Sequence, residues 1–99
     1  MCIRDRYLGG ANRALAAALA ARLRPELPEL AVVDDLARIP IALRGVNPRN
    51  PVNGSRGGGV QLELPHVARL ADSGELTAAA ARLTEVLAAF AVERAELAA

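Results

Sequence analysis

The chain has 99 residues, and its 12 arginines and 11 acidic residues leave a formal net charge of +1. This near-neutral balance supplies no basic field that would attract nucleic acid or an anionic membrane surface. An apolar content of 53% can bury the core of one small domain, although only Tyr7 and Phe90 are aromatic. A single cysteine, Cys2, excludes an intrachain disulfide, and no apolar run approaches the ~20 residues of a membrane span.

The first element predicted from the sequence is a strand that ends near Leu8. Residues 1–6 do not match the pattern that follows, and we interpret them as a non-native artefact that is excluded from the fold. Gly9 and Gly10 then turn the chain into a predicted helix over 12–24. A buried stripe at four-residue spacing, an N-cap candidate and two terminating prolines define this helix: Leu15, Leu19 and Leu23, then Asn12, then Pro25 and Pro28.

A second short strand is predicted over 30–33, where four apolar residues precede Asp34 and Asp35. Such a run is typical of a strand buried in a parallel sheet. Two strands joined by a helix make a βαβ unit, so the sequence predicts the α/β class. Adjacent side chains of a strand point to opposite faces, which disfavours a metal-binding pair and favours two aspartates that end the strand in solvent.

Residues 39–59 are predicted to be irregular. Pro40 confines 39–43 to a sheet edge or an irregular extended segment. From Arg44 to Gly59 there is no periodicity, and the segment holds three asparagines, two prolines and five glycines. A loop this long in a small domain is typically functional or disordered. The glycine run does not predict a phosphate-binding loop, because such loops open a helix and this run opens a strand.

The strand predicted over 60–64 carries the candidate catalytic residue. Apolar residues alternate there with Gln61 and Glu63, so the amide and the carboxylate share one face, and Pro65 ends the strand. A carboxylate on so apolar a strand needs a partner, which could be a cation, a metal-bound water or a substrate. A helix follows over 77–97, with a predicted buried face of Leu76, Ala80, Leu83, Leu87, Phe90 and Leu97.

Two segments, Asn50-Pro-Val-Asn53 and 56–65 (Arg-Gly-Gly-Gly-Val-Gln-Leu-Glu-Leu-Pro), resemble the C-terminal motif of the poly-gamma-glutamate hydrolase family. Weaker similarity runs from the Tyr-Leu-Gly-Gly segment at 7–10 to the last helix. The resemblance implies a zinc-dependent amidohydrolase with a three-layer α/β/α, zinc-peptidase-like fold and a mostly parallel sheet. Residues 7–99 would be the C-terminal part of its single hydrolase domain. The family pattern often has histidine at the position of Asn47, and this sequence departs from it there.

The resemblance also implies residue roles. Glu63 would act as the general base, taking a proton from a metal-bound water and delivering it to the leaving amine. The substrate, poly-gamma-glutamate, is a polyanion, and arginine suits carboxylate recognition. One histidine, His66, and one cysteine make a complete zinc site improbable, so the zinc ligands are expected outside this chain. The candidate substrate-binding residues are Arg44, Asn50, Asn53, Gln61 and Arg69.

A non-enzymatic reading of the same residues remains open. Glu63 could form a structural ion pair with Arg44 or Arg69, and Asn50 and Asn53 could only scaffold the loop. The chain would then be a small α/β module used for packing or for binding a partner.

Overall fold

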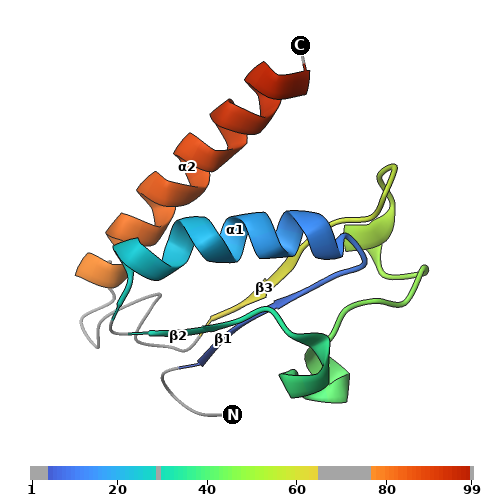
Figure 1. Cartoon of the computed structure of the whole chain (residues 1–99). Coiled ribbons are helices and arrows are strands. Elements are labelled where there is room, and N and C mark those ends of the chain that lie inside the picture. Colours follow the sequence, from blue (N-terminus) through green and yellow to red (C-terminus); the bar gives the residue numbers. More distant parts are fainter. Residues whose placement is uncertain (1–4, 29, 65–76, 99) are drawn as a thin grey trace.

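The computed structural model describes residues 5–28, 30–64 and 77–98. Within these ranges the chain forms one three-stranded sheet and two α-helices (Figure 1). The strands are β1 (Asp5–Gly9), β2 (Ala31–Val33) and β3 (Gln61–Glu63), and the helices are α1 (Arg13–Glu26) and α2 (Ala78–Ala98). Three single-turn 3-10 helices lie between β2 and β3: η1 (Leu36–Arg38), η2 (Ile41–Leu43) and η3 (Pro51–Asn53).

The sheet has the strand order β2-β1-β3 and is mixed. β1 and β2 run parallel, with Tyr7 beside Val33, as strands joined through a helix can do. β3 runs antiparallel to β1, with Tyr7 opposite Glu63 and Gly9 opposite Gln61. The predicted α/β class and βαβ unit are confirmed, whereas a mostly parallel sheet describes only one of the two strand pairs in the described ranges.

β1 includes two residues that the sequence analysis excluded from the fold. Asp5 pairs with Ala31 and Arg6 with Val32, and the Arg6 side chain is fully buried. The strand is therefore longer at its start than the Tyr-Leu dipeptide indicates. The non-native origin of residues 1–6 stays a prediction.

α1 begins at its predicted cap and ends later than its prolines indicate. Asn12 Oδ1 accepts a hydrogen bond from the Leu15 N–H at 3.0 Å, which is the N-cap contact. The helix continues one residue past Pro25, and the Leu27 N–H then bonds to the Leu23 carbonyl at 3.0 Å. Pro25 removes one backbone donor from α1, but Leu23 and Leu27 on either side of it are both buried in the core. The predicted end of the helix before Pro25 is therefore wrong.

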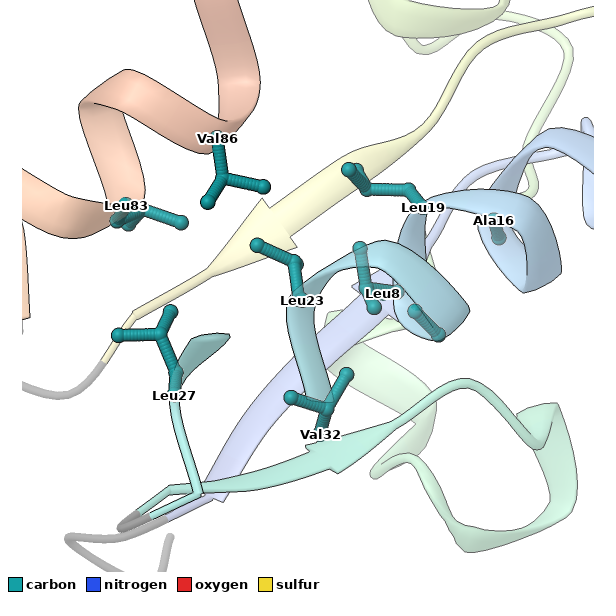
Figure 2. Close-up of a cluster of buried hydrophobic side chains, with 9 residues drawn as sticks. Leu8, Ala16, Leu19, Leu23, Leu27, Val32, Leu83 and Val86 are labelled. Carbon is teal, nitrogen blue, oxygen red and sulfur yellow. The ribbon is translucent and has the colours of Figure 1, made fainter. Parts of the chain in front are cut away.

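Both helices pack on the same face of the sheet, where they bury the main core (Figure 2). Leu83 and Val86 of α2 point toward Leu23 and Leu27 at the end of α1. Small alanines on α1 let the elements approach closely, which raises the density of contacts. The buried cluster consists of Leu8, Ala16, Leu19, Ala20, Leu23, Leu27, Val32, Leu83 and Val86.

The other face of the sheet is covered by the chain between β2 and β3. Tyr7, Val33 and Ile39 form a second buried cluster, and Leu36 and Leu43 pack against it. Leu36 belongs to η1, Ile39 directly follows η1, and Leu43 belongs to η2. The segment 39–43, predicted at a sheet edge or as an irregular extended segment, therefore contains a 3-10 turn instead. Within the described ranges, α-helix therefore covers one face only.

α2 occupies the range predicted for the last helix, but its C-terminal half leaves the core. Leu97, predicted on the buried face, is 78% exposed, while Val86 is buried. Arg22 of α1 donates to Glu93 Oε1 at 2.9 Å, which raises the pKa of Arg22, but partly exposed pairs of this kind stabilise little. Among the described helices, none has the length and apolarity needed to cross a bilayer.

Leu23→Ala should destabilise the protein strongly, because the Leu23 side chain of α1 is fully buried in the core that α1 shares with α2 and the sheet. Truncating a buried leucine costs about 2–5 kcal/mol of unfolding free energy. Leu97→Ala, the same change at an exposed site on α2, should alter it by less than about 0.5 kcal/mol. Urea unfolding of both variants measures the difference, and equal midpoints would contradict the packing described.

Candidate functional site

Glu63 lies on the sheet face that is turned away from both helices. Leu62 packs against the main core under the helices, so strand alternation directs Gln61 and Glu63 to the opposite face. Glu63 is half-buried and stands directly opposite Tyr7 in the antiparallel ladder. The predicted sharing of one face by the amide and the carboxylate is confirmed.

No ion pair joins Glu63 to an arginine in ranges 5–28, 30–64 and 77–98. The ion pair considered with Arg44 is therefore not formed, and Arg69 lies outside the described residues. These ranges also enclose no pocket, so they form no cleft around the half-buried carboxylate. An accessible, half-buried carboxylate without a cationic partner can accept a proton from a bound molecule.

Gln61 is held in place by the loop that precedes β3. Its Oε1 accepts a hydrogen bond from Asn50 Nδ2 at 3.0 Å, and its Nε2 donates to the Leu43 carbonyl at 3.4 Å. Asn50 also caps η3, because its Oδ1 accepts from the Val52 N–H at 3.1 Å. Gly45 leaves room for the amide, since a Cβ there would lie 2.7 Å from Gln61 Oε1. Two predicted substrate-binding amides thus bond to each other.

Asn53 bonds four backbone groups through its side chain. Its Oδ1 accepts from the N–H groups of Ala11 at 2.9 Å and Gly59 at 3.3 Å. Its Nδ2 donates to the carbonyls of Gly45 at 2.7 Å and Asn47 at 3.0 Å. A primary amide has two N–H donors and two acceptor lone pairs, so this hydrogen-bonding capacity is fully used. The contacts of Asn53 are those of a loop scaffold.

Arg44 is anchored but keeps the end of its side chain available. Its Nε donates to the Ile39 carbonyl at 2.8 Å, and its own carbonyl accepts from the Gly10 N–H at 2.7 Å. Neither Nη1 nor Nη2 bonds to a residue within the part of the chain that the structure describes. A guanidinium held at Nε in this way can present its two terminal nitrogens to a carboxylate.

Glycines let the loops pack directly against the end of β1. A Cβ on Gly9 would lie 2.3 Å from the Arg44 carbonyl oxygen, and one on Gly10 would lie 2.1 Å from the Gly59 carbonyl oxygen. Gly10 also has a φ of +92°, a conformation that other residues rarely adopt. Likewise, a Cβ on Gly59 would lie 2.1 Å from the Val52 carbonyl oxygen.

Arg13 is a structural residue that the sequence analysis missed. Its Nη1 donates to the carbonyls of Leu8 at 3.0 Å and Gly10 at 3.1 Å, and its Nη2 donates to the Asp34 carbonyl. The guanidinium therefore ties together the carboxyl ends of β1 and β2. Asp34, expected in solvent, is half-buried and pairs with Arg24 at 2.8 Å. Nothing in the sequence separates Arg13 from the other arginines.

The described residues do not fit a zinc site. They contain no group of three or more His, Cys, Asp or Glu side chains that could hold a metal ion. A catalytic zinc needs about three protein ligands. Cys2 and His66, the two remaining residues considered for the metal, lie outside the described ranges.

Comparison with known proteins gives one match. A family model described as poly-gamma-glutamate hydrolase matches residues 3–93, a range that includes all three strands and Glu63. Neither the curated proteins nor the solved structures gave a match.

Gly10→Ala should disrupt the site more than any other single methyl group added to the loop region. The added Cβ would collide with the Gly59 carbonyl, and the positive φ adds strain, so we expect a loss of more than about 3 kcal/mol in unfolding free energy or no folding. Gly54→Ala is the matched control, because Gly54 has a φ of −72° and a Cβ there would lie 3.2 Å from its nearest neighbour, the Pro51 carbonyl oxygen. Thermal unfolding by circular dichroism checks both, and a stable Gly10→Ala protein would contradict the close approach.

Proposed function

The chain belongs to the poly-gamma-glutamate hydrolase family, and on that premise we propose that it serves the hydrolysis of gamma-glutamyl amide bonds in poly-gamma-glutamate. The position of Glu63 is the observation that supports this most directly. The carboxylate is half-buried, lies on the face that the α-helices leave uncovered, and has no arginine partner among the described residues. A carboxylate tied up in a structural ion pair could not serve as a base.

Glu63 acts as the general base in this proposal. It accepts a proton from the attacking water while the water oxygen bonds to the amide carbonyl carbon. When the C–N bond of the tetrahedral intermediate breaks, Glu63 returns the proton to the leaving nitrogen. Gln61, two residues away on the same face, stands about 7 Å along the strand and is fixed by Asn50. Its fixed amide gives the substrate a polar neighbour beside the reacting bond.

Arg44 supplies the recognition of the polyanion. Every residue of poly-gamma-glutamate carries a carboxylate, and the terminal nitrogens of Arg44 can bind one in a bidentate manner. Anchoring at Nε to the Ile39 carbonyl reduces the side-chain freedom lost on binding. Arg69 is proposed for the same purpose. No nucleic acid or membrane partner is part of the proposal.

Zinc dependence, the three-layer α/β/α peptidase-like fold and the assignment of residues 7–99 to the C-terminal part of a single hydrolase domain are proposals that rest on the family resemblance. The described residues provide no zinc ligand set, so we draw no catalytic step through the metal. Its ligands are proposed to lie outside this chain.

Glu63→Gln should abolish hydrolysis without unfolding the protein, because the amide keeps the size of the side chain but cannot accept the proton. Loss of a general base lowers turnover by about 10²–10⁴-fold. The measurement is the release of glutamate oligomers from poly-gamma-glutamate, made with a form of the protein that also includes the proposed zinc ligands. Glu85→Gln, at an exposed position on α2, is the matched control and should retain turnover. Unchanged turnover in Glu63→Gln would remove Glu63 from the mechanism.

Zinc should bind this chain weakly and without fixed stoichiometry, because the ligands are proposed to lie elsewhere. Isothermal titration calorimetry of the purified chain with Zn²⁺ measures this. Tight binding of one equivalent would overturn the placement of the ligands. Repeating the titration with Glu63→Gln would then show whether Glu63 is one of them.

A further inference from the structure

We propose that Asn53 is a positioning residue for Glu63. Asn53 fixes the start of β3 through its contacts with backbone groups and does not touch the substrate. The inference rests on the proposed role of Glu63 as the base. It reassigns an asparagine that the sequence analysis placed among the candidate substrate contacts.

The oxygen of Asn53 joins the two strands whose pairing places Glu63. Ala11, which donates to Oδ1 at 2.9 Å, follows the end of β1, and Gly59, which donates at 3.3 Å, precedes the start of β3. One side-chain atom therefore sets where the antiparallel ladder begins. Glu63 lies only four positions after Gly59, so a shift at Gly59 moves the strand that carries the carboxylate.

The nitrogen of Asn53 holds the loop that covers Gln61. It donates to the Gly45 carbonyl at 2.7 Å, and Gly45 packs directly against the Gln61 amide. Asn50 caps the same 3-10 turn, and its Nδ2 donates to Gln61 Oε1 at 3.0 Å. The turn η3 and its cap thus hold Gln61, two residues before Glu63, through Asn50 directly and through Gly45 indirectly.

The packing leaves little room for these contacts to adjust. Gly59 lies against the Val52 carbonyl and Gly10 against the Gly59 carbonyl, both at distances that exclude a methyl group. A loosened Asn53 would let β3 move as a unit. A misplacement of about 1 Å of a catalytic group can cost on the order of 10² in rate. A positioning residue should therefore affect kcat, whereas a substrate contact should affect KM.

Asn53→Asp tests this with a change of one atom. The carboxylate can still accept from Ala11 and Gly59, but its second oxygen faces the carbonyls of Gly45 and Asn47. In the wild type these carbonyls lie on average closer to the Asn53 side chain, at 2.7 and 3.0 Å, than the N–H groups of Ala11 and Gly59, at 2.9 and 3.3 Å. The charged form is therefore disfavoured on balance, and the pKa of the new carboxyl rises above its value in the unfolded chain. The protonated form can donate one of the lost bonds. The variant should be closest to wild type at low pH and should lose order as pH rises through the raised pKa.

Hydrogen exchange measured by NMR gives the readout that does not depend on activity. In Asn53→Asp, the amide protons of Ala11, Gly59 and the β1–β3 ladder should exchange faster than in wild type, whereas those of α1 should exchange at the same rate. The ratio of variant to wild-type exchange rates should shrink as pH falls. Asn12→Asp is the matched control, because the Asn12 side chain caps α1 through its oxygen, aspartate caps equally well, and the backbone bond from Asn12 N–H to the Gly59 carbonyl is kept. Unchanged exchange at Gly59 would overturn the inference.

Kinetics on poly-gamma-glutamate give the second readout. Asn53→Asp should lower kcat by about 10²-fold near neutral pH and leave KM within about twofold. A raised KM with unchanged kcat would overturn the inference in favour of a substrate contact. A wild-type protein that includes the proposed zinc ligands and still does not hydrolyse the polymer would overturn the proposed function, while the exchange data would still decide whether Asn53 holds β3.

Asn50→Ser is a milder second variant in case Asn53→Asp does not fold. Serine can still cap η3 at the Val52 N–H, but it is too short to reach Gln61. The expected result is again a lower kcat with KM unchanged, and a kcat equal to that of wild type would contradict the clamp on Gln61.

Discussion

Direct backbone contact between the end of β1 and the loop before β3 is the constraint on which the rest of the structure depends. Gly10 and Gly59 meet without intervening side chains, and Asn53 bonds both segments from the side. These contacts join residues more than forty positions apart in the chain. Once they form, β3 can pair only antiparallel to β1, with Glu63 opposite Tyr7.

The division of the sheet into two different faces follows from this arrangement. One face buries the leucines of α1 and the first half of α2, which supplies most of the apolar burial that holds the domain together. The other is covered by short 3-10 turns and an asparagine-rich loop, whose amides and carbonyls hydrogen-bond to one another. The larger apolar cluster therefore lies on the helix-covered face, while the second face combines a small apolar cluster with the polar loop contacts beside Glu63.

Periodic features of the sequence predicted the regular elements well. Alternation placed Gln61 and Glu63 on one face, and Asn12 was recognised as the cap of α1. The leucine spacing marked the buried side of α1 at Leu19 and Leu23, whereas Leu15 lies outside the buried core. Where periodicity ends, prediction failed: a single 3-10 turn such as η2 has too few residues to show a repeat. Leu97 continues the spacing of α2 but lies beyond the surface that could bury it.

The sequence singled out the candidate site residues, but it did not predict how they are arranged. Asn50 and Asn53 were both selected from the motif, yet which atoms they bond depends on the distant Ala11 and Gly45, which no local pattern reveals. A crystal structure with a bound gamma-glutamyl oligomer would show whether Glu63 is the base. If it is, a Glu63 carboxylate oxygen should lie within about 2.6–3.2 Å of a water positioned at the scissile carbonyl. A Glu63 paired with Arg69, or turned away from the bound oligomer, would contradict it.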